Sequence, residues 1–91
     1  MHTTTHASVR QQQRGIPPLI IDWLLQYGER EHDGRGAEIV YFSKDSLKDI
    51  RHYAGDLVFR KLDKLFGTYA VVQGGSVITT GHHYKRITRK N

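Results

Sequence analysis

The strongest constraint on the fold is a pair of β-branched runs near the C-terminal end, separated by a glycine turn. Residues 68–73 (TYAVVQ) and 77–80 (VITT) are rich in the residue types that favour strands. Between them, Gly74-Gly75-Ser76 is a short turn sequence of the kind that joins two antiparallel strands. The pattern predicts a β-hairpin, so this end of the chain must belong to a sheet.

A second hairpin is predicted earlier in the chain. Residues 38–42 (EIVYF) are typical of a strand, and the polar residues 29–33 form an extended first arm at the sheet edge. Residues 34–36 (GRG) make the tight connection between them. Two hairpins separated by helix most simply form one four-stranded antiparallel sheet with helices packed on a face, which is the α+β class.

Three helical segments surround these hairpins. The first is predicted over residues 6–13, and the second over residues 18–27, with Gly28 as its C-terminal stop. The third is predicted over residues 44–66, between the two hairpins, and is bent or broken at Gly55. The two N-terminal helices and the inserted helical segment complete the predicted order of elements.

A chain of 91 residues is slightly shorter than a typical domain, so residues 1–91 are expected to form a single domain. The apolar side chains of segment 44–66, Leu57 and Val58 among them, repeat at helical spacing and are expected on one packed face. The predicted core consists of Trp23, Leu24, Ile39, Leu47, Ile50, Leu62, Leu65, Val71 and Ile78.

The charge of the chain is concentrated at its two ends. Fourteen Lys and Arg residues against nine Asp and Glu residues give a net charge of +5. The residues before 15 and after 84 together carry +6, whereas residues 15–84 carry −1. If the two ends meet in space, they form one basic patch that favours phosphate-rich partners, above all nucleic acid. The alternative is a scatter of solubilising charge.

Composition and motifs exclude several classes of site. The chain has no cysteine, and therefore no disulfide, thiolate zinc site or cysteine nucleophile. No apolar run reaches the roughly 18 residues of a membrane-spanning helix, and the first residues lack the hydrophobic stretch of a secretory signal. We therefore expect a cytoplasmic protein without membrane contact. Because phosphate-binding loops, zinc-protease motifs and nucleophile elbows are absent, no metal or cofactor is predicted.

The first candidate site is a stripe on the predicted first helix. His6, Arg10 and Arg14 follow one another at intervals of four residues, which places them on one helix face. Arginine side chains in such a stripe bind phosphate, and the imidazole of His6 is able to move protons near neutral pH. An ordinary solvent-exposed helix face would show the same spacing.

The second candidate site is the sequence that leaves the last predicted strand. An aromatic ring among cations is able to stack on a base while its neighbours hold phosphate. An ordinary polar strand end is the alternative. The candidates in this sequence are His82, His83, Tyr84, Lys85 and Arg86, with Arg89 adding charge. Weaker candidates in the first predicted hairpin are Arg35 and Tyr41.

A family resemblance rests on both candidate sites. The segment His6-Ala7-Ser8-Val9-Arg10, followed by three glutamines and Arg14-Gly15-Ile16, resembles the HAxxRxxxRGI opening of a bacterial family of unknown function. That family is grouped with the RelE/ParE and BrnT toxins of toxin–antitoxin pairs. The last predicted strand with the residues after it, VITTGHHYKRI, is similar to the way such chains finish.

The resemblance implies a RelE-like fold and a metal-independent endoribonuclease whose partners are RNA, free or on the ribosome, and a small acidic antitoxin protein. In that chemistry the 2′-hydroxyl of the RNA attacks the adjacent phosphate, so the enzyme supplies cations and acid–base groups rather than a nucleophile. Arg10, Arg14 and Arg86 would supply charge. His82 or His83 and Tyr84 would transfer protons, with His6 in reserve, while Lys85, Arg35 and Arg89 would contact RNA.

Two other classes of function fit the same residues. A non-catalytic RNA- or DNA-binding module would use the same basic patch without proton transfer. A ParE-like toxin would act on a protein target instead of RNA. These classes differ in whether a histidine lies beside the arginines, because phosphate binding alone needs no imidazole at neutral pH.

Overall fold

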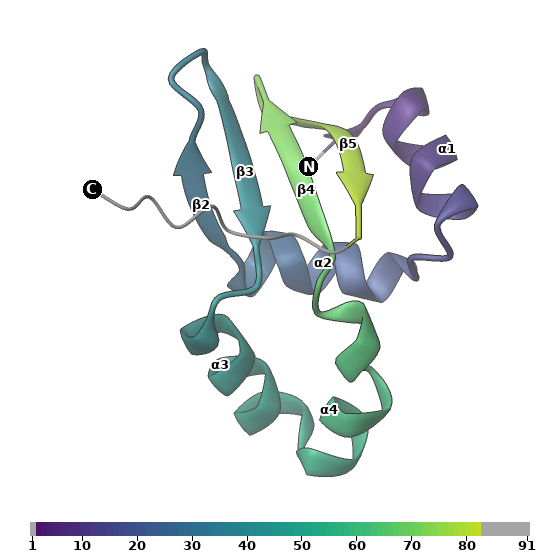
Figure 1. Ribbon diagram of the computed structural model, residues 1–91, viewed down its shortest axis with the longest axis vertical. Helices are drawn as coiled ribbons and strands as arrows, with labels where there is room; N and C mark the ends of the chain where they lie inside the picture. Colours follow the sequence, from purple (N-terminus) through teal and green to yellow (C-terminus); the bar gives the residue numbers. More distant parts are fainter. Residues whose placement is uncertain (1, 83–91) are drawn as a thin grey trace.

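The computed structural model describes residues 2–82, and residues 1 and 83–91 lie outside the described part. The elements in chain order are β1 (His2–Thr3), α1 (Thr5–Gln13), α2 (Pro18–Tyr27), β2 (Glu29–His32), β3 (Ala37–Tyr41), α3 (Lys44–Ala54), α4 (Asp56–Lys61), the 3₁₀ helix η1 (Asp63–Leu65), β4 (Tyr69–Gln73) and β5 (Ser76–Gly81). The strands form one sheet in the order β1-β5-β4-β3-β2 (Figure 1). The predicted α+β class is confirmed.

Four of the strands form the predicted antiparallel sheet, and β1 is an addition to it. β2 pairs with β3, β3 with β4 and β4 with β5, each antiparallel. β1 instead pairs in parallel with β5, with His2 opposite Ser76 and Thr3 opposite Val77. A strand of two residues carries no recognisable alternation, because a period of two needs several residues to be seen.

The helix boundaries follow from local capping and from close packing. α1 begins one residue earlier than predicted because the Thr4 hydroxyl accepts a hydrogen bond from the Ala7 N–H at 3.2 Å. α2 has the predicted bounds. Gly28 ends α2 where the chain lies close to its neighbours: a Cβ at this position would collide with the Leu24 carbonyl oxygen and lie 2.7 Å from Cγ1 of Val40.

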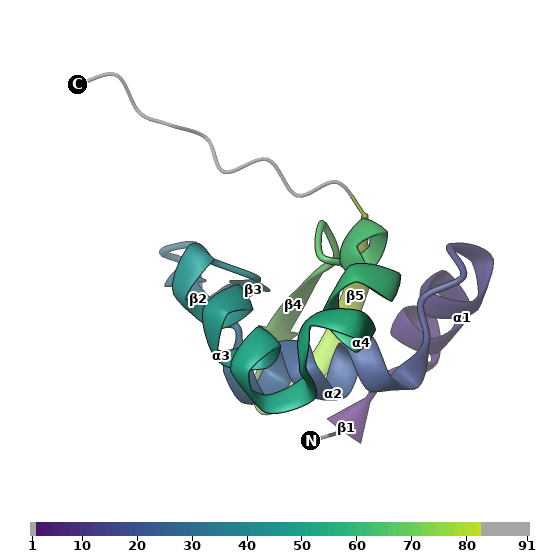
Figure 2. The same cartoon turned by 90° about the horizontal axis from the view of Figure 1, so that it is seen from below.

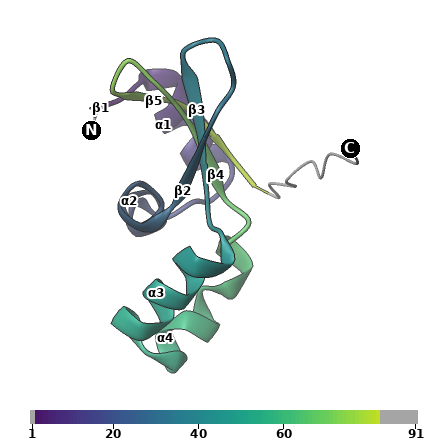
Figure 3. The same ribbon diagram turned by 90° about the vertical axis from the view of Figure 1, so that its left-hand side faces the viewer.

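The core lies on the face of the sheet that α2 covers. Val40 and Ala70 are paired across β3 and β4, and both are fully buried. α2 contributes Ile20 and Leu24, which are also fully buried. Figure 3 shows α1 and α2 on one side of the sheet, while no described helix covers the other side, which we call the open face.

Three predicted core residues belong elsewhere, which corrects the prediction for the sheet. Ile39 and Val71 are paired with each other one position away from the buried Val40 and Ala70, so their half-buried side chains lie on the open face. Ile78 is the extra residue of a β-bulge, because Val71 pairs with Thr79 whereas Val72 pairs with Val77. The core residues predicted in the helical segments are confirmed. Three of them are buried, namely Trp23, Leu24 and Ile50. The other three pack against the core while partly buried, namely Leu47, Leu62 and Leu65.

The helical segment between the hairpins is broken at Gly55, as predicted, where φ is +89°. It does not present one packed face, because Leu57 and Val58 of α4 are exposed rather than packed. α3 and α4 extend from one end of the sheet as a pair of helices (Figure 1). Within residues 2–82, no helix combines the length and the apolar character needed to cross a bilayer.

Candidate nucleic-acid interface

The first helix packs along the last strand. α1 lies beside β5 at one side of the sheet (Figure 1), and Ala7 of α1 is fully buried in the core. The residue before α1 is bound to the same strand, because the Thr4 N–H donates to the Val77 carbonyl at 3.0 Å and the Thr4 hydroxyl donates to the Ile78 carbonyl at 3.5 Å. The fold therefore brings the basic stripe of α1 to the strand that precedes the C-terminal basic sequence.

His82 connects the end of β5 to the end of α1. Its Nε2 lies 2.7 Å from the carbonyl oxygen of Arg14, and its Nδ1 lies 3.4 Å from the hydroxyl oxygen of Thr68. Because a carbonyl oxygen only accepts, Nε2 must carry the proton, and Nδ1 of the neutral ring then accepts from the Thr68 hydroxyl. We call this region, formed by Arg10, Arg14, Thr68, Thr80 and His82, the α1–β5 junction.

These contacts restrict what His82 is able to do chemically. Both ring nitrogens have partners within the protein, so a proton transfer to RNA would first require one contact to open. The contact to Thr68 is the longer one and opens at the smaller cost. The role of His82 in proton transfer stays a prediction, whereas its positioning role follows directly from the geometry.

The arginines of α1 lie at the junction in different environments. Arg14 is exposed, and Arg10 is half-buried. Nε of Arg10 is buried without a hydrogen-bond partner, and so is Oγ1 of Thr80 on β5. Buried polar atoms without partners are rare in folded proteins, so both atoms are candidates for contact with a bound group. Within residues 2–82, neither arginine forms an ion pair.

His6 lies farther along the same helix. Its side chain is exposed, two turns before Arg14, a separation of about 12 Å along the helix axis. The predicted site residues His83, Tyr84, Lys85, Arg86 and Arg89 lie outside the described residues and directly follow His82 in the sequence.

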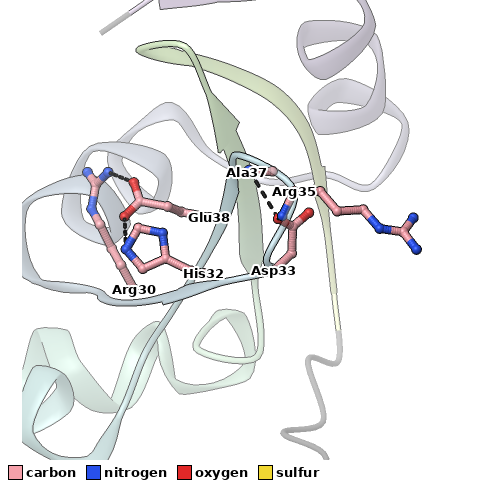
Figure 4. Close-up of polar contacts among 6 residues, drawn as sticks. All are labelled: Arg30, His32, Asp33, Arg35, Ala37 and Glu38. Carbon is pink, nitrogen blue, oxygen red and sulfur yellow. Dashed lines mark hydrogen bonds and ion pairs between the residues drawn. The ribbon is translucent and has the colours of Figure 1, made fainter.

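Arg35 is not part of the junction. It lies at the tip of the β2–β3 hairpin, where the Asp33 carboxylate accepts hydrogen bonds from the N–H groups of Arg35 at 2.7 Å and Ala37 at 3.1 Å (Figure 4). These bonds, the one from Arg35 first, lower the pKa of Asp33. Figure 2 shows this hairpin at the opposite edge of the sheet from α1. The predicted grouping of Arg35 with the RNA contacts is therefore not supported by its position.

The β2–β3 hairpin carries its own ion pairs instead. Glu38 accepts from Arg30 at 3.2 Å and lies 3.5 Å from Nε2 of His32 (Figure 4). Tyr41, the other weak candidate, donates its hydroxyl proton to Glu29 at 3.1 Å. Burial, followed by this hydrogen bond, raises the pKa of Tyr41 to about 12. Tyr41 is thus a neutral structural residue at physiological pH.

Besides Thr80, two residues at or next to the junction escaped the sequence analysis. Thr68 is fully buried and contacts His82, although it precedes β4 by one residue. Tyr69 pairs with Gly81, and a Cβ at Gly81 would lie 2.7 Å from the Tyr69 hydroxyl oxygen. A glycine at the end of a β-branched run was the available signal, because it often marks a close approach of another group.

Comparison of the chain with protein-family models, with curated proteins and with solved structures finds no match. The resemblance to the RelE/ParE and BrnT toxins therefore stays a hypothesis, carried by the residues quoted for it. What the described residues establish is an α+β protein whose first helix and last strand meet at a basic junction.

Proposed function

We propose that this protein is a toxin-like, metal-independent endoribonuclease that binds RNA at the α1–β5 junction. The observation that carries the proposal is the contact between Nε2 of His82 and the carbonyl oxygen of Arg14. It joins the basic end of α1 to the point where the chain enters the basic sequence after His82. A polyanion bound at this point would meet Arg10 and Arg14 next to the place where the basic sequence begins.

The state of the arginines supports binding of phosphate. Arg10 and Arg14 have no carboxylate partner within residues 2–82, so no ion pair has to break before a phosphate binds. The buried Nε of Arg10 is desolvated without compensation from the protein. A guanidinium in this state gains more from a charge-assisted hydrogen bond than one already paired with a carboxylate.

The proposed reaction is an intramolecular transesterification, in which the phosphorus exchanges its bond to the 5′-oxygen for a bond to the 2′-oxygen of the RNA. A base removes the 2′-hydroxyl proton, the 2′-oxygen forms a bond to the adjacent phosphorus, and the bond to the 5′-oxygen breaks as that oxygen gains a proton. The products are a 2′,3′-cyclic phosphate and a 5′-hydroxyl. Arg10, Arg14 and Arg86 stabilise the developing phosphorane, and His83, Tyr84 or His6 move the protons.

The direct test is cleavage of labelled single-stranded RNA by the purified chain, with and without ribosomes and in the presence of a chelator. We expect cyclic-phosphate products that persist with the chelator and that are lost in Arg14→Gln. Arg60→Gln is the matched control, because Arg60 is an exposed arginine on α4, away from the junction. RNA left intact by the wild type, with and without ribosomes, would refute the nuclease.

A non-catalytic RNA-binding module is the second candidate function. It is favoured by one observation, namely that both ring nitrogens of His82 are already bonded within the protein. Retained RNA binding without any cleavage in the same assay would establish this function in place of the first.

A further inference from the structure

The second helix of the α3–α4 pair is weakly attached to the sheet. α4 has no buried residue, and its main contacts are with α3 and η1 rather than with the sheet. Three large apolar side chains of this pair are exposed: Tyr53 by 70%, Leu57 by 68% and Val58 by 40%. These three side chains lie outside the lining of the two hollows described next.

A groove runs over the surface of this pair. It consists of two adjoining hollows of about 290 and 470 Å³ that share Lys48 and Arg51. Leu47 and Phe59 supply apolar side chains to the smaller hollow. We call these two hollows together the α3–α4 groove. Its full lining is Lys44, Leu47, Lys48, Arg51, His52, Gly55, Asp56 and Phe59.

The lining of the groove is positively charged. Three cationic side chains and one carboxylate give it a net charge of +2 with His52 neutral. The carboxylate of Asp56 is already bound to Arg51, with 2.6 Å between Oδ1 and Nε. Lys44 and Lys48 are exposed and form no ion pair within residues 2–82. These two lysines, one helical turn apart, are therefore available to a partner.

The surroundings of the Phe59 ring favour a peptide over single-stranded nucleic acid as the occupant of the groove. The Phe59 ring has the Arg51 guanidinium 5.8 Å from its centroid and the Phe66 ring 4.9 Å away. A ring engaged in this way offers a poor platform for stacking a nucleobase, on which single-stranded nucleic acid relies. Aliphatic side chains of a peptide need only apolar surface to bury, and Leu47 and Phe59 provide it.

We propose that the α3–α4 groove binds an acidic, amphipathic segment of a partner protein, with carboxylates on Lys44 and Lys48 and aliphatic side chains against Leu47 and Phe59. This arrangement follows the general way in which grooves between helices bind amphipathic segments. Charge complementarity selects an acidic segment over a basic one and accelerates its association. The proposal does not depend on RNA cleavage, because none of these residues belongs to the α1–β5 junction.

The test is a selection of short random peptides by display against the full chain, followed by affinity measurements on the enriched sequences. We expect enrichment of Asp and Glu together with Leu, Ile or Val, and binding that weakens as salt is raised. The double variant Lys44→Glu/Lys48→Glu should weaken binding of the enriched peptides about tenfold or more, because it reverses the charge that faces the carboxylates.

The matched control is Lys61→Glu/Lys64→Glu, which makes the same change of charge at exposed lysines outside the groove and should leave affinity nearly unchanged. If the first variant unfolds in urea at lower concentration than the wild type, Lys44→Gln/Lys48→Gln takes its place. Equal losses in both variants, no enrichment, or enrichment without acidic residues would overturn the proposal. So would a single-stranded RNA oligonucleotide whose binding is lost in the groove variant and kept in Arg14→Gln.

Discussion

His82 and Arg14 are 68 positions apart in the sequence, yet Nε2 of the first lies 2.7 Å from the carbonyl oxygen of the second. The Arg14 carbonyl belongs to the residue that ends α1, where carbonyl groups have no partner within the helix. His82 therefore supplies the partner that the helix itself does not. With the Thr68 hydroxyl on the other ring nitrogen, one side chain connects the ends of α1 and β5 to the start of β4.

The first prediction concerns the stability that this connection contributes. His82→Ala removes both hydrogen bonds and leaves the buried Thr68 hydroxyl without that partner, so the free energy of unfolding should fall by about 1–2 kcal/mol. Urea denaturation measures it. His52→Ala, at an exposed position of α3, should change stability by less than about 0.5 kcal/mol. Equal effects of the two substitutions would mean that the contact contributes nothing.

The second prediction tests whether His83 transfers protons during RNA cleavage or contributes only to RNA binding. If His83 acts as general acid or base, His83→Ala should reduce RNA cleavage by roughly 10²–10⁴-fold. RNA affinity should change little, because a neutral imidazole contributes little to phosphate attraction. Single-turnover cleavage and equilibrium binding on the same RNA distinguish the two effects. Unchanged cleavage in His83→Ala would remove His83 from the mechanism and direct attention to His6.

The third prediction uses the unpartnered nitrogen of Arg10. Arg10→Met keeps an unbranched apolar stem and removes a buried donor without a partner, so stability should stay within about 1 kcal/mol of the wild type or increase. RNA binding should nevertheless weaken, and the slope of log affinity against log salt should flatten by about 0.7, the value for one phosphate contact on a single strand. Arg60→Met is the control and should leave the slope unchanged. Loss of stability without loss of binding would make Arg10 a structural residue.

The fourth prediction tests which face of the sheet forms the core. Leu24→Ala should destabilise by roughly 2–5 kcal/mol, because Leu24 is fully buried and its truncation leaves a cavity. Val71→Ala, on the open face, should cost clearly less, about 1 kcal/mol, because Val71 is already half-exposed. Chemical denaturation of both variants gives the comparison. A larger loss at Val71 would show that the open face is covered in solution.

The fifth prediction concerns alkaline pH. Because burial and the bond to Glu29 raise the pKa of Tyr41 from 10.0 to about 12, the folded state keeps a proton that the unfolded state loses. The associated stability is present below pH 10 and declines between about pH 10 and 12. Tyr41→Phe should flatten this decline in pH-dependent denaturation. A tyrosinate absorbance titration of the folded protein in which all five tyrosines ionise together near pH 10 would contradict the assignment.

The sequence alone was sufficient for features that depend on neighbouring residues. The glycine turn between β4 and β5, the helix of α2 and the break at Gly55 are set by local backbone preferences, so each was predictable. The stop of α2 at Gly28 was predicted as well, but the glycine is required there by close packing against Val40. The charge excess at the two ends is likewise a property of composition.

Only the tertiary structure decided which apolar residues form the core and which basic residues meet. β3 and β4 have apolar residues on both faces, so the alternation does not tell Val40 from Ile39, and the choice depends on the side on which α2 packs. The bulge at Ile78 and the two-residue β1 depend on pairing across the sheet. The contact of His82 with Arg14 arises because α1 packs on a strand more than sixty residues away, and no local pattern encodes such a distance.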